Sequence, residues 1–317
     1  MRETIILGAN GFVGRSLASR LLARADGGRV VLGSRGPMDL GADGAGERVE
    51  TLRYDDLRSV DADRLADADV VVDLVSGGRD RFGSEPNMFA RVDGHARIVD
   101  ELVRREWGGH FVFLSSGGTI YGPGSRDPIP ETAPLRPVGA YGLEKAMIEL
   151  HLDTLGRWGA LSSLTLRLAN VYGPGQAARA GFGIVPTLIR AMGDGTGFTR
   201  YGTGKAVRDY VFIDDVVEAI IAATGARATG AFNIGSGEGT SINDLIAQVR
   251  DLTGRPLTVK PVANPAGEPE AIVLDPGRAR EAFGWTPRVS LREGLRRTLA
   301  HHGLIDGCDT ASEALAG

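Results

Sequence analysis

The sequence predicts an α/β protein in which a doubly wound parallel sheet is followed by a smaller C-terminal α+β domain. In the first half, short apolar runs alternate with helical patterns, as is typical of parallel strands joined by crossover helices. A glycine-rich turn directly follows the first apolar run. In the second half, loops rich in glycine and proline surround short strands and amphipathic segments. This change of texture predicts two regions with different roles.

The elements follow in order along the chain. Strands are expected at Thr4–Leu7, Arg29–Gly33, Val49–Arg53, Val70–Leu74, His110–Leu114 and Ser163–Leu168. Helices are expected between them at Val13–Ala23, Pro86–Glu106 and Ala140–Trp158. The amphipathic segments of the second half are Val216–Ala223, Ile242–Leu252 and Leu291–Leu304.

Composition excludes several classes of protein. The chain has 317 residues, 42% hydrophobic and 24% charged, which is ordinary for a globular protein. A net charge of -4 gives no electrostatic reason to bind nucleic acid or an anionic membrane. No apolar run approaches the roughly 20 residues of a spanning helix. Met1 runs straight into a strand without a signal peptide, and Cys308 is a single cysteine, so we expect a cytoplasmic protein. The histidines lack partners at ligand spacing, so no metal site is expected.

The turn after the first strand is a candidate phosphate-binding loop. Three glycines, Gly8, Gly11 and Gly14, allow a tight turn, close approach of a pyrophosphate, and close packing of helix on strand. The free N–H groups at the start of the next helix favour anions. The order strand, turn and helix therefore predicts a Rossmann-type dinucleotide site that includes Asn10, Phe12 and Val13.

Tyr141 and Lys145 form the candidate catalytic pair. Four positions apart on the expected helix, they share one face, so an ammonium can lie beside a phenol. Such a neighbour suits a tyrosine that exchanges a proton far below its usual pKa of about 10. The chain has only three lysines among 36 Lys and Arg, which favours a specific need for lysine here. Tyr201 and Lys205 have the same spacing, but the glycines between them make a helix unfavourable.

With this pair, the spacing Gly-x-x-Gly-x-x-Gly resembles the extended, nucleotide-sugar-modifying branch of the short-chain dehydrogenase/reductase superfamily. The resemblance covers nearly the whole chain. Its other motifs are Ser115–Gly122, Asn170–Gly175, Val207–Asp215 and Phe232–Gly237. It implies a dinucleotide-binding domain over residues 1–169 with a returning segment near 207–236, a substrate domain mainly over 170–305, and a flexible tail over 306–317.

The resemblance implies a nicotinamide cofactor bound by several strand ends. Asp56 and Leu57 match the adenine position, and Leu74 at the end of one strand and Ser115 directly after another are also expected to bind the cofactor. After the second strand, Ser34 and Arg35 stand where NAD-dependent relatives usually have an acid for the ribose hydroxyls. A cation and a hydroxyl suit a 2′-phosphate, so this position favours NADP(H), with NAD(H) as the alternative.

The resemblance further implies that Tyr141 is the acid/base, that Lys145 lowers its pKa and bonds the nicotinamide ribose, and that a small hydroxyl polarises the substrate oxygen. Here the chain departs from the family pattern. Aligned through the residues before Gly122, the hydroxyl position is Gly117. Counted back from Tyr141 it is Ser116, and Thr119 is a further candidate.

On the substrate side, the resemblance implies that Asn170, Arg208 and Asp275 contact a nucleotide-diphosphate sugar, since arginine can clamp phosphate oxygens. Two expected contacts are missing from the sequence: an arginine near Asn264–Glu268 and an asparagine near Arg91–Gly94. The long helices suggest a homodimer, as is common in the family.

Two hydride-transfer reactions at hexose C4 fit these residues. An NADPH-dependent 4-ketoreductase of nucleotide-linked 4-keto(deoxy)hexoses is slightly favoured by Arg35, and an NAD-dependent 4-epimerase, similar to UDP-glucose 4-epimerase, is the alternative. A sensor that binds NADP(H) without turnover needs the glycine turn but not Tyr141 and Lys145, so the intact pair argues against it.

Overall fold

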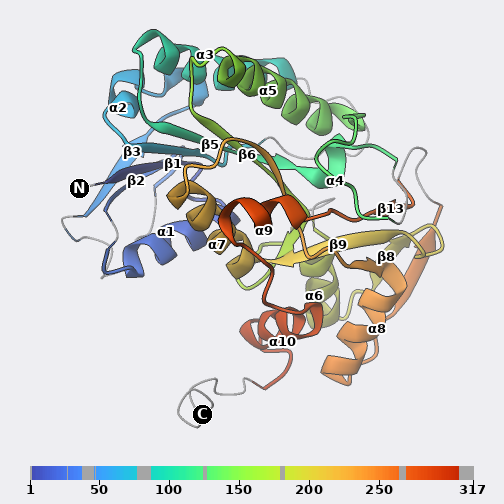
Figure 1. Cartoon of the computed structure of the whole chain (residues 1–317). Helices are drawn as coiled ribbons and strands as arrows, with labels where there is room; N and C mark the ends of the chain where they lie inside the picture. The colour runs from blue at the N-terminus through green and yellow to red at the C-terminus, as the bar shows by residue number, and fades with distance from the viewer. Residues whose placement is uncertain are drawn as a thin grey trace.

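The computed structural model of the chain describes residues 2–26, 28–37, 46, 48–76, 87–123, 127–178, 183–263 and 269–306. Its first lobe is built on a seven-stranded parallel sheet with the order β10-β6-β5-β4-β1-β2-β3 (Figure 1). The strands are β1 Glu3–Leu7, β2 Arg29–Ser34, β3 Val49–Arg53, β4 Val70–Asp73, β5 His110–Ser116, β6 Ser163–Leu168 and β10 Gly230–Ile234. From β1 the chain passes outward to β2 and β3, then crosses back to β4 on the other side of β1 and continues outward through β5 and β6, so the direction of winding reverses between β1 and β4.

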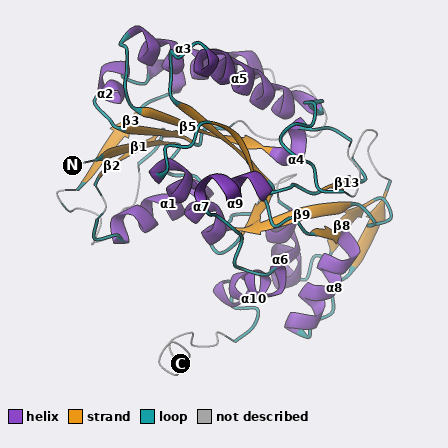
Figure 2. Cartoon of the chain, in the orientation of Figure 1, coloured by secondary structure: helices purple, strands orange, loops and turns teal. Residues whose placement is uncertain are grey.

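Helices cover both faces of this sheet (Figure 2). On one face lie α1 (Phe12–Ala23) and α7 (Ile213–Gly225), and on the other lie α3 (Met88–Arg104), α5 (Gly139–Arg157) and the short α2 (Ala62–Ala66). Successive strand residues point to opposite faces, so Val72 belongs to the core under α1 while Val71 belongs to the core under α3. Strands buried on both faces explain the nearly continuous apolar runs, and the predicted doubly wound parallel sheet is confirmed.

The second lobe holds smaller sheets and the remaining helices. Strands β7 Asn170–Tyr172, β9 Val207–Phe212, β11 Gly239–Ser241 and β13 Ala271–Ile272 form a four-stranded sheet, and β8 Phe198–Tyr201 pairs with β12 Val259–Val262. The helices are α6 Ile184–Asp194, α8 Ile242–Thr253, α9 Gly277–Phe283 and α10 Leu291–His301. Since α9 packs on β10 and α7, this late segment lies against the first lobe.

Most predicted elements match the observed ones to within a few residues. The strands Val49–Arg53 and Ser163–Leu168 have the predicted bounds. The predicted elements leave out the helices α2, α6 and α9 and give no bounds for the strands after β6. They also leave out the 3₁₀ turn Leu57–Ser59 and the helix α4, Gly117–Ile120. The 3₁₀ turn and α4 are too short to show a helical period in the sequence. Within 207–236, β9 lies in the second lobe, whereas α7 and β10 lie in the first. Residues 307–317 of the predicted tail are outside the described part of the chain.

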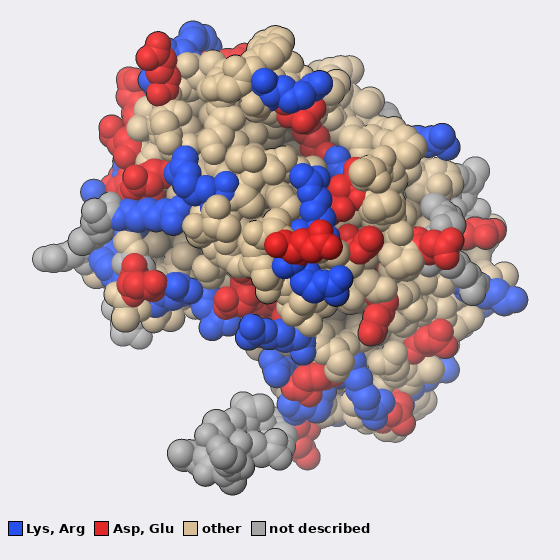
Figure 3. All heavy atoms as spheres, in the orientation of Figure 1, with Lys and Arg blue, Asp and Glu red and all other residues tan. Residues whose placement is uncertain are grey.

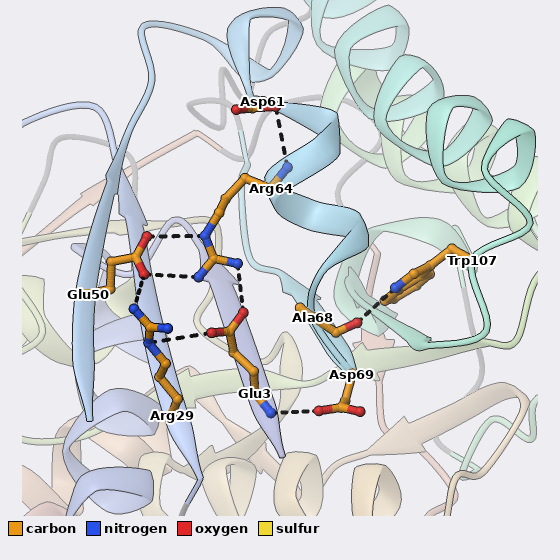
Figure 4. A network of polar contacts seen from close by, with 8 residues as sticks. All are labelled: Glu3, Arg29, Glu50, Asp61, Arg64, Ala68, Asp69 and Trp107. Carbon is orange, nitrogen blue, oxygen red and sulfur yellow. Dashed lines mark hydrogen bonds and ion pairs between the residues drawn. The ribbon is translucent and has the colours of Figure 1, made fainter. Parts of the chain in front are cut away.

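A network of ion pairs lines the amino-terminal edge of the main sheet (Figure 4). Arg64 of α2 binds Glu3 of β1 (Nη1 to Oε1, 2.7 Å) and Glu50 of β3 (Nη2 to Oε2, 3.1 Å). Arg29 of β2 binds the same Glu50 (Nη2 to Oε2, 2.6 Å). The carboxylate of Asp69 accepts a hydrogen bond from the Glu3 N–H at 2.7 Å. These contacts join three neighbouring strands at the edge opposite the glycine turn.

Charged side chains of both signs are interspersed over the face seen in Figure 3. That face shows no large area of a single sign, as expected from a net charge of -4. Among the described helices, none combines the length and the apolar character needed to cross a membrane.

Candidate active site

The glycine turn joins the end of β1 to the start of α1. Gly8 has φ +80°, and its N–H and that of Ala9 donate to the carbonyl of Gly33 at 3.0 and 2.9 Å. A Cβ on Gly14 would lie 2.5 Å from the carbonyl oxygen of Gly8, so only glycine lets α1 pack this closely on the turn. The N-cap of α1 is Gly11, which has no side chain to cap the first N–H groups. These groups are therefore available to an anion.

The ends of β2 and β3 carry the residues predicted to contact the adenosine half of a cofactor. Ser34 is buried, and its hydroxyl donates to the carbonyl of Gly36 at 2.6 Å, while Arg35 is exposed. Asp56 is exposed, and the Arg58 side chain and backbone hold the pKa of its carboxyl below the usual range. Leu57 is buried under Gly94 of α3. The Ser34 hydroxyl thus already donates within its own loop. At the end of β2, the exposed charged group that could meet the adenosine half is therefore the guanidinium of Arg35.

Tyr141 and Lys145 lie on α5, as predicted. The Lys145 side chain is 1% exposed, and its Nζ lies 5.9 Å from the centre of the Tyr141 ring and 4.4 Å from that of Phe113. The ammonium donates to the carbonyl of Val75, just after β4, at 3.2 Å. By contrast, Tyr201 ends β8 and a turn separates it from Lys205, so that pair shares no helix. Only the first pair places an ammonium beside a phenol on one helical face.

The candidate hydroxyls cluster where β5 passes into α4. Ser116 ends β5 and is buried, and the Thr119 hydroxyl donates to its carbonyl at 3.4 Å. Ser115 is also buried, and its Oγ has no hydrogen-bond partner within the described residues. A Cβ on Gly142 would lie 2.6 Å from the carbonyl oxygen of Thr119, so α4 packs directly on the start of α5. Ser116 and Thr119 therefore lie next to the helix that carries Tyr141.

The structure explains why position 117 holds glycine instead of the hydroxyl of the family pattern. A Cβ on Gly117 would lie 2.5 Å from Cδ1 of Leu274, whose side chain is fully buried. Leu274 is held by its N–H, which donates to the Asp209 carboxylate at 3.2 Å. A larger residue at 117 therefore needs a shift of Leu274, a constraint that comes from a distant part of the sequence.

The predicted substrate residues lie in and beside the second lobe. Asn170, on β7, donates through its side chain to the carbonyl of Asp209 on β9 at 2.9 Å. Arg208 is half-buried on β9, and its guanidinium donates to the carbonyl of Val207 at 2.8 Å. Asp275 accepts from the N–H of Gly277 at 2.8 Å at the start of α9. Each residue thus also has a structural contact. The segment Asn264–Glu268, where the family arginine is missing, lies outside the described residues.

Several residues near the site were missed by sequence reasoning. The N–H of Gly8 donates to the hydroxyl of Tyr54, 3.0 Å away, and burial raises the pKa of Tyr54 to about 12. Asp73 and His95 form a buried pair next to the end of β4. A carboxylate at the end of the otherwise apolar strand Val70–Asp73 was a usable signal for Asp73, whereas nothing in the sequence paired it with His95. In the described part of the chain, no group of His, Cys, Asp and Glu side chains is arranged to hold a metal.

The chain is similar to known proteins over nearly its whole length. Residues 4–235 match the sequence profile of the NAD dependent epimerase/dehydratase family. A UDP-glucose 4-epimerase of Mycolicibacterium smegmatis is 33% identical over 94% of this chain and 97% of its own. A dTDP-6-deoxy-L-talose 4-dehydrogenase (NAD(P)(+)) of Kitasatospora kifunensis is 29% identical over 92% of each chain.

Among solved structures, a Thermus thermophilus UDP-glucose 4-epimerase in complex with NAD superposes with a TM-score of 0.83, 28% identity, and coverage of 95% of this chain and 99% of the other. The match extends through both lobes. The chain therefore belongs to the NAD dependent epimerase/dehydratase family and is an enzyme of the extended short-chain dehydrogenase/reductase superfamily.

Proposed function

We propose that this enzyme is an NAD-dependent 4-epimerase of UDP-hexoses. The observation that carries the proposal is the similarity to a UDP-glucose 4-epimerase over 94% of this chain, with Tyr141 and Lys145 together on α5. The relatives thus favour the epimerase over the 4-ketoreductase that Ser34 and Arg35 slightly favour in the sequence. Both reactions use the same tyrosine and lysine, so the distinction rests on the cofactor.

The residues present fit a nicotinamide dinucleotide. The turn from Gly8 to Gly14 leaves no room for a Cβ on Gly14 and exposes the uncapped start of α1, which suits a pyrophosphate. We assign Asn10, Gly11, Phe12 and Val13 to that half of the cofactor. Ser34, Arg35, Asp56 and Leu57 would hold the adenosine end, and Leu74, Ser115 and Lys145 the nicotinamide end.

NAD, when bound, accepts and returns a hydride at C4 of its nicotinamide ring. Tyr141 takes the proton from the C4 hydroxyl of the sugar and returns it to the same oxygen after the sugar has presented its other face. Lys145 favours the tyrosinate form, because an ammonium beside a phenol stabilises the phenolate. Ser116 donates to the sugar oxygen as charge develops on it, with Thr119 as the alternative donor. Asn170, Arg208 and Asp275 are assigned to the nucleotide diphosphate.

The second candidate is an NADPH-dependent 4-ketoreductase. It is favoured by one observation: no carboxylate ends β2, where exposed Arg35 follows Ser34 and suits a 2′-phosphate. The two candidates differ in how long the cofactor stays bound, because an epimerase regenerates its own NAD in each cycle and a reductase releases its cofactor.

Purified protein tests the choice. An epimerase should carry NAD through purification, visible by absorbance and mass spectrometry after denaturation, and should interconvert UDP-glucose and UDP-galactose without added cofactor. Protein that arrives without NAD, leaves UDP-glucose unchanged and oxidises NADPH with a 4-keto sugar nucleotide would establish the reductase instead.

We also propose a homodimer formed through α3 and α5. Exposed apolar side chains are Phe89 (70%) on α3, Leu150 (64%) and Leu143 on α5, and Trp158 (77%) directly after α5. Apolar side chains gathered on two packed helices suit a second copy of the same surface. Light scattering should give twice the 33.4 kDa chain mass, and Leu150→Glu should give monomers.

A further inference from the structure

A buried polar pair lies beneath the candidate catalytic lysine. Asp73 is the last residue of β4 and His95 lies on α3, and both side chains are completely inaccessible to solvent. Nδ1 of His95 is 2.5 Å from Oδ2 of Asp73. Because a carboxylate only accepts hydrogen bonds, Nδ1 carries the shared proton. Nε2 of His95 has no hydrogen-bond partner within the described residues.

Two sets of contacts connect this pair to Lys145. The other oxygen of Asp73, Oδ1, accepts the N–H of Val75 at 3.0 Å, and the carbonyl of Val75 accepts from Nζ of Lys145 at 3.2 Å. The ring of His95 packs edge-on against Phe113, with centroids 5.7 Å apart, and Phe113 in turn lies 4.4 Å from Nζ of Lys145. The pair thus supports both groups that contact the ammonium.

The neighbouring carboxylate does not provide this support. Glu144 precedes Lys145 on α5 and is fully buried, but its Oε2 lies 2.7 Å from Nε of Arg91 on α3. Among the described residues, the charged or titratable groups on the elements that pack here include Tyr141 and Glu144 on α5, Arg91 and His95 on α3, and Asp73 on β4.

Burying a carboxylate and an imidazole costs desolvation energy that an apolar pair of the same size avoids. What the pair contributes in return is a fixed position for the Lys145 side chain. We propose that His95 and Asp73 are positioning residues. His95 orients the Asp73 carboxylate, and that carboxylate fixes the peptide of Val75. The Val75 carbonyl then holds the Lys145 ammonium in place beside Tyr141. This inference rests on the proposed proton transfer by Tyr141 and Lys145.

The test compares His95→Leu with His95→Asn, because an asparagine amide can donate from near the position of Nδ1 and leucine cannot. In His95→Leu we expect kcat for UDP-glucose to fall by about 10²-fold, as for a misplaced catalytic group, with a much smaller change in KM. We expect the pH of half-maximal kcat to move upward, since a displaced ammonium stabilises the tyrosinate less. His95→Asn should recover most of the rate and the original pH profile.

His151→Leu is the matched control. His151 also joins α5 to α3, through Asp100 at 3.0 Å, but this pair is partly exposed. Its removal should leave kcat and the pH profile unchanged. If His95→Leu keeps the wild-type kcat and pH profile per folded molecule, or if His95→Asn is no better than His95→Leu, the inference is wrong.

NADH binding separates this inference from the proposed function. Should wild-type protein turn over no sugar nucleotide, the proposed function fails. The position of Lys145 can then still be followed by NADH fluorescence. His95→Leu should weaken NADH binding about tenfold if Lys145 is displaced from the ribose, and equal affinity in both proteins would overturn the positioning role.

Discussion

The two edges of the main sheet use charged residues in opposite ways. At the amino-terminal edge, Glu3, Arg29, Glu50 and Arg64 bind one another in a partly exposed network (Figure 4). At the carboxyl-terminal edge, the buried charge of Lys145 meets a backbone carbonyl and an aromatic ring. The first network satisfies its charges within itself, whereas the second leaves an ammonium beside a phenol.

This difference teaches where function lies in the fold. In a parallel sheet the carboxyl ends of the strands and the switch between β1 and β4 form the natural ligand crevice. At the carboxyl-terminal edge, a charged side chain can act on a ligand only if no opposite charge of the protein already pairs with it. At the amino-terminal edge, the charged side chains pair with one another and join the strands.

The largest effect is expected for Tyr141→Phe. Loss of the phenol removes the proton acceptor, so kcat should fall by about 10²–10⁴-fold, while NADH affinity stays within about twofold, since ring and helix are kept. Turnover with UDP-glucose and NADH fluorescence measure the two quantities. Tyr201→Phe, at the second Tyr-x-x-x-Lys site, is the control and should retain full activity. Equal turnover by Tyr141→Phe would remove this tyrosine from the mechanism.

The second-largest effect is expected for the buried ion pair of Arg167 and Glu149, whose loss should lower the free energy of unfolding. Arg167 on β6 binds Glu149 on α5 at 2.7 Å and donates to the Tyr121 hydroxyl at 2.8 Å. Arg167→Met leaves the Glu149 carboxylate buried and unpaired, so the free energy of unfolding should fall by about 3–5 kcal/mol. Urea denaturation measures it. Arg157→Met breaks the exposed pair with Asp153 on α5 and should cost at most about 0.5 kcal/mol. If both variants lose a similar free energy of unfolding, burial does not make the Arg167 pair more important than the exposed Arg157 pair.

An intermediate effect is expected where Leu274 meets Gly117. Gly117→Ser restores the hydroxyl of the family pattern but forces Leu274 to move, so we expect a loss of about 1–3 kcal/mol in unfolding free energy and no gain in kcat. The same substitution in a Leu274→Ala background has room for the hydroxyl. Its cost should then be smaller than in the wild type by at least about 0.5 kcal/mol. Simple additivity of the two substitutions would show that Leu274 does not exclude the side chain.

The smallest effect belongs to the amino-terminal edge. Arg64→Met should lower the free energy of unfolding by about 1 kcal/mol at pH 7. The Arg64 hydrogen bond is the main cause that lowers the pKa of Glu50 below its usual value. A lowered pKa stabilises the fold above the unfolded pKa of about 4.3, and this stability is lost as pH falls through the lower folded value. The difference between wild type and Arg64→Met in urea should therefore shrink between pH 5 and pH 3. A constant difference would mean that Glu50 is not involved.

Local patterns predicted the parts of the site that are contiguous in sequence. The turn from Gly8 to Gly14 and the pair of Tyr141 and Lys145 each depend on one turn or one helix, whose period is visible in the residues. The glycines between Tyr201 and Lys205 likewise made a helix unfavourable there, and Tyr201 does end a strand. Short elements such as α4 carry no such period, so the sequence favoured Ser116 over Thr119 only by its spacing from Tyr141.

By itself, the sequence determined the doubly wound sheet, the glycine turn after β1 and the placing of Tyr141 and Lys145 on one helix, because periodicity, glycine placement and side-chain chemistry act over a few residues. Only the tertiary structure decided that Leu274 occupies the space beside Gly117 and that Asp73 meets His95 below Lys145. These contacts join residues 22 to 157 positions apart, and packing density in a closed core, not local preference, sets which of them form.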